Sequence, residues 1–119
     1  MADAADRTQG RTQGRGHGLS PAQVERIRAV LRPFADRIEL AGLFGSRATG
    51  RWKPASDIDL VLYGPVAEAE VDRIRTLLME EGLPVPVDIV AYRAIEGTAL
   101  QRHIDGVMQP LLTSDELRA

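Results

Sequence analysis

The chain has 119 residues, of which 44% are hydrophobic, 27% are charged and 4% are aromatic, and it contains no cysteine. This length and composition are those of one folded domain, and the lack of cysteine excludes disulfides and thiolate metal sites. The formal net charge of −2 at pH 7 argues against direct binding of nucleic acid, which needs a basic face.

Residues 1–18 carry a tandem RTQG repeat followed by RGHG, with no apolar residue after Ala5. A segment of this composition cannot bury enough surface to order itself. We therefore expect a flexible N-terminal tail over residues 1–18 and one folded domain over residues 19–119. For the arginines of the tail, we favour solvent exposure over contact with phosphate.

The first helix is expected to begin at Pro21. Ser20 suits the N-cap, proline suits the first helical position, and Gln23 completes a capping box. Apolar residues then recur at helical spacing. Because Pro33 has no N–H to donate, we expect the regular helix to end near Arg32.

The rest of the domain alternates between strands and helices. Short apolar runs predict the strands, and one-sided apolar stripes predict the helices. Gly82 supplies a helix stop, and Pro110 fits a strand at the edge of a sheet. In chain order we expect strands at 38–44 and 58–63, a helix at 67–81, a strand at 85–92, a helix near 97–105 and a strand at 107–112.

Asp57 and Asp59 stand two residues apart at the start of the strand predicted at 58–63. Side chains alternate along a strand, so both carboxylates point to the same face. Two like charges in this arrangement repel one another unless a cation lies between them. The pair therefore predicts a magnesium site, because Mg²⁺ prefers oxygen ligands.

Asp88 is the one charged residue within the strand predicted at 85–92, between Val87 and Ile89. An ionised carboxylate in such an apolar setting is costly without a partner. If the two strands are neighbours, Asp88 joins Asp57 and Asp59. Three carboxylates can hold two divalent ions ~3.5 to 4 Å apart, an arrangement that catalyses phosphoryl transfer.

Upstream of the aspartates, the strand predicted at 38–44 is followed by Gly45 and Ser46. Glycine allows the backbone to approach a phosphate closely, and Ser46 offers a hydroxyl and caps a short helix whose amides face the anion. Arg47 is a further candidate for phosphate contact. Together these residues predict a nucleotide-binding cradle.

Two other known motifs do not match these residues. Gly45 and Gly50 have the spacing of a Walker loop, but Arg51 and Trp52 stand where Lys-Ser or Lys-Thr is required. In haloacid-dehalogenase phosphatases and many glycosyltransferases an Asp-x-Asp follows an apolar strand. Here the strand comes after the pair, so those families fit poorly.

The segments LFGSRATG, SDIDLVL and VDIV resemble the minimal nucleotidyltransferases, or MNT proteins, of the DNA polymerase β-like superfamily, over residues 20–112. The signature is Gly-Ser, about ten residues, Asp-x-Asp and a third Asp on a later strand. The resemblance implies an α/β (α+β) fold with a small mixed sheet and flanking helices. It also implies that Gly45 and Ser46 bind the triphosphate of ATP, and that Asp57, Asp59 and Asp88 bind two Mg²⁺ ions.

The resemblance further implies a partner. MNT proteins act as antitoxins beside a helical HEPN ribonuclease, and active members transfer AMP from ATP to a tyrosine of that toxin. We therefore expect a magnesium-dependent nucleotidyltransferase that AMPylates a HEPN toxin. Two alternatives stay open: an antitoxin that neutralises by binding alone, and transfer to a small molecule such as an aminoglycoside.

The chain carries no predicted membrane span or signal peptide. No apolar run approaches ~18 residues, and no charged-then-apolar start with a cleavage site is present. We expect a cytoplasmic protein. Larger relatives of the family have an added helical domain for which this chain has no room, so recognition of the acceptor is expected to depend on a second protein.

Overall fold

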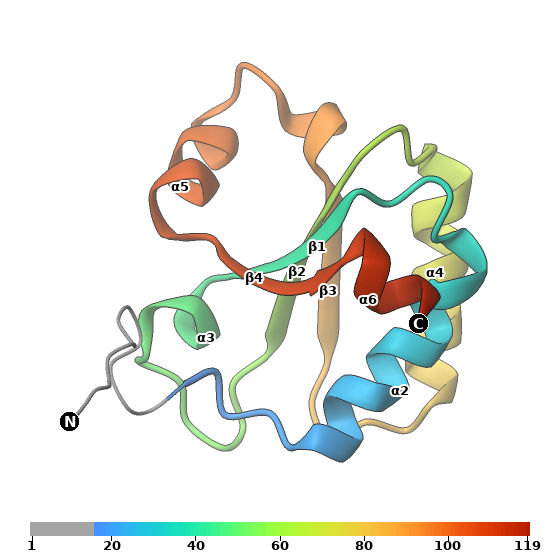
Figure 1. Cartoon of the computed structure of the whole chain (residues 1–119). Helices are drawn as coiled ribbons and strands as arrows, with labels where there is room; N and C mark the ends of the chain where they lie inside the picture. Colours follow the sequence, from blue (N-terminus) through green and yellow to red (C-terminus); the bar gives the residue numbers. More distant parts are fainter. Residues whose placement is uncertain (1–15) are drawn as a thin grey trace, which may run out of the picture.

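A four-stranded mixed sheet organises the computed structural model, which describes residues 16–119 (Figure 1). The strand order is β3-β2-β1-β4, with β1 antiparallel to both β2 and β4 and with β2 parallel to β3. This confirms the predicted α/β fold with a small mixed sheet and flanking helices. The strands are β1 (Leu40–Phe44), β2 (Ile58–Tyr63), β3 (Val87–Ala91) and β4 (Gln109–Thr113).

Helix α2 (Pro21–Leu31) begins as the sequence predicts. Ser20 Oγ accepts from the Gln23 backbone N–H at 3.1 Å, and Gln23 Oε1 accepts from the Ser20 N–H at 2.8 Å. The regular helix ends before Pro33, and a 3₁₀ turn, η1 (Arg32–Phe34), follows. The capping box and the proline therefore set the two ends of α2.

Helix α4 (Glu68–Glu80) connects the two parallel strands, β2 and β3. A parallel pair needs such a crossover, because a tight hairpin joins only antiparallel strands. The helix ends just before Gly82, whose φ of +69° is a conformation that glycine adopts without strain. The predicted helix and its stop are confirmed.

Helices cover the two faces of the sheet unequally (Figure 1). Helices α2, α4 and α6 (Ser114–Arg118) cover one face, and α5 (Ala99–Val107) covers part of the other. The short helix α3 (Ser46–Thr49) follows β1. The large side chains fully buried on the first face are Ile27, Leu31, Ile38, Leu43, Ile58, Leu60, Leu62, Ile74, Leu78, Ile89 and Leu117.

The end of the chain differs in detail from the prediction. Helix α5 runs on to Val107, so β4 begins at Gln109 instead of 107, and Pro110 lies in an edge strand as expected. Helix α6 and the 3₁₀ turn η2 (Tyr92–Ile95) were not predicted. The capping box of α6, in which Thr113 pairs with Glu116, is a Thr-x-x-Glu signal that is legible in the sequence.

The predicted flexible tail covers residues 1–18, of which 1–15 lie outside the described residues. Its last three residues are attached to the domain. The backbone carbonyls of Gly16 and His17 accept hydrogen bonds from Trp52 Nε1 and Arg47 Nη1, each at 3.0 Å. Contacts with the folded domain therefore already begin at Gly16, three residues before the expected boundary.

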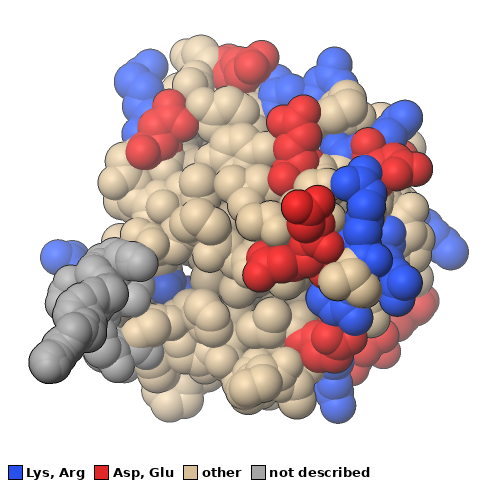
Figure 2. Space-filling model, in the orientation of Figure 1, with Lys and Arg blue, Asp and Glu red and all other residues tan. Residues whose placement is uncertain are grey.

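The surface carries charges of both signs. In the face drawn in Figure 2, acidic and basic side chains lie next to one another toward the side of α2 and α4, and the middle of the view is largely uncharged. Within residues 16–119, no helix combines the length and the apolar character that crossing a membrane requires.

Candidate functional site

The parallel pairing of β2 and β3 brings two of the predicted aspartates together. Asp59 of β2 stands opposite Asp88 of β3, and residues paired in register share a face of the sheet. Asp57 directly precedes β2, and its negative charge acts on Asp59. The prediction that the two strands are neighbours is confirmed, and Asp59 and Asp88 lie side by side in the sheet, with Asp57 directly before β2.

These carboxylates act on one another electrostatically. The pKa of Asp59 is raised by burial, and further by the negative charges of Asp88 and Asp57. Asp59 is half-buried, whereas Asp57 and Asp88 are exposed. The end of the sheet that holds them therefore concentrates negative charge, which a cation would neutralise.

The expected apolar setting of Asp88 is wrong. Its neighbours Val87 and Ile89 pack into the core on the opposite face, because side chains alternate along β3. Asp88 itself is exposed. Asp88 is therefore a candidate site residue because it lies beside Asp59, and not because its burial is costly.

Gly45 lies directly against Asp59. Phe44, the last residue of β1, pairs with Asp59, and Gly45 follows with a φ of +71°. A Cβ at this position would lie 2.2 Å from Asp59 Oδ2, so any other residue would displace the carboxylate. Ser46 is the first residue of α3, with Gly45 as its N-cap. The Gly-Ser pair and the carboxylates therefore form one continuous site.

The donor set suits a hard divalent cation, since it consists of carboxylate oxygens. Within residues 16–119, however, no three His, Cys, Asp or Glu side chains are grouped closely enough to hold an ion as they stand. The chemistry of Asp57, Asp59 and Asp88 fits magnesium, whereas the coordination geometry requires their oxygens to converge. Mutual repulsion of the three charges opposes that convergence until a cation is present.

The structure gives Arg47 a different position from the predicted phosphate contact. Its side chain is 3% exposed, and burial lowers the pKa of its guanidinium group. Nη1 donates to His17 O at 3.0 Å, and Nη2 donates to Ser56 O at 2.9 Å. Residue type and spacing do not show that a cation turns inward to backbone carbonyls, so these contacts were not predicted.

Comparison with known proteins adds independent findings. The sequence model of the family described as nucleotidyltransferase domain matches residues 24–109, a range that contains all the site residues. No curated protein matches the chain. A solved structure described as "Crystal structure of the toxin-antitoxin with AMP-PNP" is similar, with a TM-score of 0.62, 22% identity and coverage of 80% of each chain.

A second solved structure is a putative nucleotidyltransferase from Sulfolobus solfataricus. It is 19% identical, with coverage of 78% of this chain and 82% of that chain and a TM-score of 0.45. At 22% identity, the likeness to the toxin–antitoxin protein is a likeness of fold. The family match and this fold agree with the mixed sheet and its flanking helices.

Proposed function

The chain belongs to the nucleotidyltransferase domain family, and from this premise we propose that it transfers AMP from ATP to a tyrosine hydroxyl of a partner toxin, whose antitoxin it is. The observation that carries the proposal is the juxtaposition at one end of the sheet. Asp59 lies opposite Asp88, and its carboxylate lies against Gly45 at the start of the Gly-Ser turn.

Asp57, Asp59 and Asp88 would hold Mg²⁺. When bound, the metal neutralises the phosphates and activates the attacking oxygen. Ser46 offers its hydroxyl to the triphosphate, beside the backbone of Gly45. The tyrosine oxygen bonds to the α-phosphorus as the bond to pyrophosphate breaks, and the exposed Asp88 orients the hydroxyl and accepts its proton.

The partner and the nucleotide are supported by comparison with known proteins. The structurally similar protein was solved as a toxin–antitoxin pair with AMP-PNP, an ATP analogue. The resemblance to MNT proteins points to a HEPN ribonuclease as the toxin. Exposure of Asp57 and Asp88 fits an acceptor supplied by another protein, because such an acceptor must reach the carboxylates from solvent.

Transfer is tested by incubating the chain with α-labelled ATP, Mg²⁺ and a HEPN partner. We expect label on a partner tyrosine, and a loss on the order of 10²-fold or more in Asp59→Asn. Asp72→Asn, on the far side of the sheet and 69% exposed, is the matched control and should retain activity. If nucleotide binds but no label reaches the partner with Mg²⁺ or Mn²⁺, the transfer reaction is wrong.

One observation favours a second function, neutralisation of the toxin by binding alone. Within the described residues the carboxylates do not form a ready-made metal site. A double variant, Asp57→Asn with Asp59→Asn, separates the two functions. If it neutralises the toxin as well as the unchanged chain does, occlusion is sufficient; if neutralisation is lost while the complex still forms, catalysis is required.

A further inference from the structure

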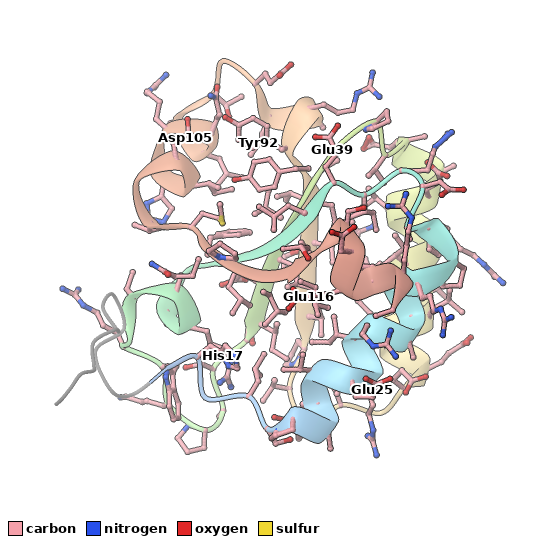
Figure 3. All side chains as sticks on the ribbon, viewed as in Figure 1. His17, Glu25, Glu39, Tyr92, Asp105 and Glu116 are labelled. Atoms are coloured by element: carbon pink, nitrogen blue, oxygen red, sulfur yellow. The ribbon has the colours of Figure 1, made fainter. Side chains whose placement is uncertain are left out.

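Residues 16–18, here called the N-terminal strap, are held against α3 and the segment that follows it. Trp52 Nε1 donates to Gly16 O at 3.0 Å, and Arg47 Nη1 donates to His17 O at 3.0 Å. The imidazole of His17 turns back to its own chain, where Nδ1 accepts from the Leu19 N–H at 3.0 Å. Figure 3 shows His17 between this segment and the start of α2.

Gly18 shows how closely the strap fits. Its φ is +76°, and a Cβ there would lie 2.6 Å from two ring atoms of Trp52 and 2.7 Å from Arg47 Nη1. Both the backbone conformation and the lack of space therefore require glycine. A strap packed this tightly shields the guanidinium group of Arg47 from solvent.

Arg47 joins the strap to the site. It follows Ser46 directly in α3, and its Nη2 donates to Ser56 O, the carbonyl immediately before Asp57. The guanidinium carbon lies 5.6 Å from the centroid of the Trp52 ring. One side chain thus connects the Gly-Ser turn, the strap and the start of the Asp-x-Asp segment.

Packing alone does not account for a charge in this place. A buried cation loses its hydration, and an apolar side chain of similar size would fill the space at less cost. Arg47 Nε is also buried with no hydrogen-bond partner within residues 16–119. What the guanidinium group supplies, and an apolar residue cannot, is a fork of two donors with fixed geometry.

We infer that Arg47 is a positioning residue, which holds Ser56 and hence Asp57 in place beside the Gly-Ser turn, and that the strap completes this arrangement. The inference deepens the proposed function, since the element it positions is the proposed metal site. It assigns to residues 16–18 a part in the site that their sequence did not predict.

The variants that test the inference are Arg47→Met, which keeps the bulk and removes both donors, and Arg47→Lys, which keeps the charge and one donor. Gly18→Ala places a Cβ against Trp52 and Arg47 and so displaces the strap, while residue 47 remains an arginine. Arg73→Met removes an exposed arginine of α4 and serves as the matched control. Thermal unfolding of each variant establishes first that it is folded.

Hydrogen exchange is the first measurement, because it does not depend on metal binding. The N–H groups of Ser56 and Ile58, which donate to Lys53 O and Pro86 O, report on the segment around Asp57. We expect their exchange to be about tenfold faster in Arg47→Met, less accelerated in Arg47→Lys and Gly18→Ala, and unchanged in Arg73→Met. Unchanged exchange in a folded Arg47 variant would overturn the inference.

Affinity for Mn²⁺, measured by electron paramagnetic resonance, is the second readout. We expect the Kd to rise about tenfold in Arg47→Met and by less in Arg47→Lys, because the lysine still donates a hydrogen bond. If Arg47 only filled space, the two variants would have the same Kd. If the unchanged chain binds no Mn²⁺, the proposed metal site fails, and the exchange comparison still decides the role of Arg47.

The strap has its own reporter, because Trp52 is the single tryptophan of the chain. Gly18→Ala is expected to change its fluorescence as the strap leaves the indole ring, and to raise the Kd for Mn²⁺ by a smaller factor than Arg47→Met does. If the fluorescence changes while exchange at Ser56 and Ile58 and the affinity for Mn²⁺ both stay the same, the strap has no part in the site.

Discussion

The two faces of the sheet differ in what they bury. On the face covered by α2, α4 and α6, β2 contributes Ile58, Leu60 and Leu62, each fully buried in a continuous aliphatic core. On the other face, the same strand contributes Asp59, Val61 and Tyr63. One alternating strand therefore serves stability with one side and the candidate site with the other.

The second face is itself divided along its length. Helix α5 packs on part of it, where Phe44, Val61 and Ile104 form a small buried cluster, and the stacked rings of Tyr63 and Tyr92 pack against this cluster. At the end that carries the two aspartates, Asp88 is exposed and Asp59 is half-buried. Burial is thus large where no chemistry is proposed and small where charge must stay accessible. Substitutions on the packed face should therefore lower stability, and substitutions of the aspartates should lower metal affinity.

The largest effect is expected from Leu60→Ala, on the packed face. Leu60 is fully buried, so truncation loses apolar contacts and leaves a cavity. We expect the free energy of unfolding, measured by urea denaturation, to fall by about 2–5 kcal/mol. Met79→Ala is the control, since Met79 is 77% exposed and its loss should change stability by less than about 0.5 kcal/mol.

If the two faces are independent, Leu60→Ala should leave metal binding at the aspartates unchanged. Where the variant is still folded, its affinity for Mn²⁺ should match that of the unchanged chain. A loss of affinity at low temperature, far from unfolding, would show that the two faces do not act independently.

A smaller effect is expected from Tyr92→Phe. This substitution removes the hydroxyl that attaches Tyr92 to α5. The Tyr92 hydroxyl donates to Asp105 Oδ1 at 2.8 Å and accepts from Gln101 Nε2 at 2.8 Å, and Figure 3 shows Tyr92 pointing toward Asp105. We expect a loss of unfolding free energy that is clearly smaller than that of Leu60→Ala, because the two hydrogen bonds of the hydroxyl are removed at an accessible position. Hydrogen exchange should place the change in α5.

Tyr63→Phe is the matched control for that variant. Its ring stacks on Tyr92 with centroids 4.6 Å apart, and within residues 16–119 no hydrogen bond is formed by its hydroxyl. The stacking survives the substitution, so stability should change little. Equal losses in the two variants would mean that the hydrogen bonds of Tyr92 do not anchor α5.

The features that the sequence predicted are those whose signals lie close together in the chain. The ends of α2 are marked by Ser20, Gln23 and Pro33 within the helix or beside it, and they were found. The Asp-x-Asp pair was recognised from residues two positions apart at the start of β2. The proximity of Asp88 needed one assumption about strand neighbours, and the parallel pairing with β2 bears it out.

The parts that were missed depend on contacts between distant residues. The partners of Arg47 are carbonyl groups of His17 and Ser56, 30 and 9 residues away. Backbone carbonyls belong to every residue and so leave no mark in a sequence. The exposure of Asp88 was missed for another reason: apolar neighbours in the chain were taken for neighbours in space, although alternation turns them to the opposite face.

The smallest effect, and the one opposite in sign, is expected from Asp59→Asn. At pH 7 Asp59 is more costly to ionise in the folded protein than in the unfolded chain, because burial and the charges of Asp88 and Asp57 raise its pKa. A neutral side chain of the same shape removes that cost. In chelator-treated buffer, we therefore expect the variant to be more stable by about 0.5 kcal/mol, a small value because the group is partly exposed.

Addition of Mn²⁺ should reverse the order of stability. The unchanged chain gains stability as its carboxylates bind the ion, whereas Asp59→Asn gains little, so the two melting curves cross as the metal concentration rises. Asp72→Asn, which gives up an exposed ion pair with Arg75, should be slightly less stable or unchanged with and without metal. If Asp59→Asn is less stable than the unchanged chain without metal, the Asp59 carboxylate stabilises the fold. The inference that the aspartates lower the stability of the metal-free protein would then be wrong.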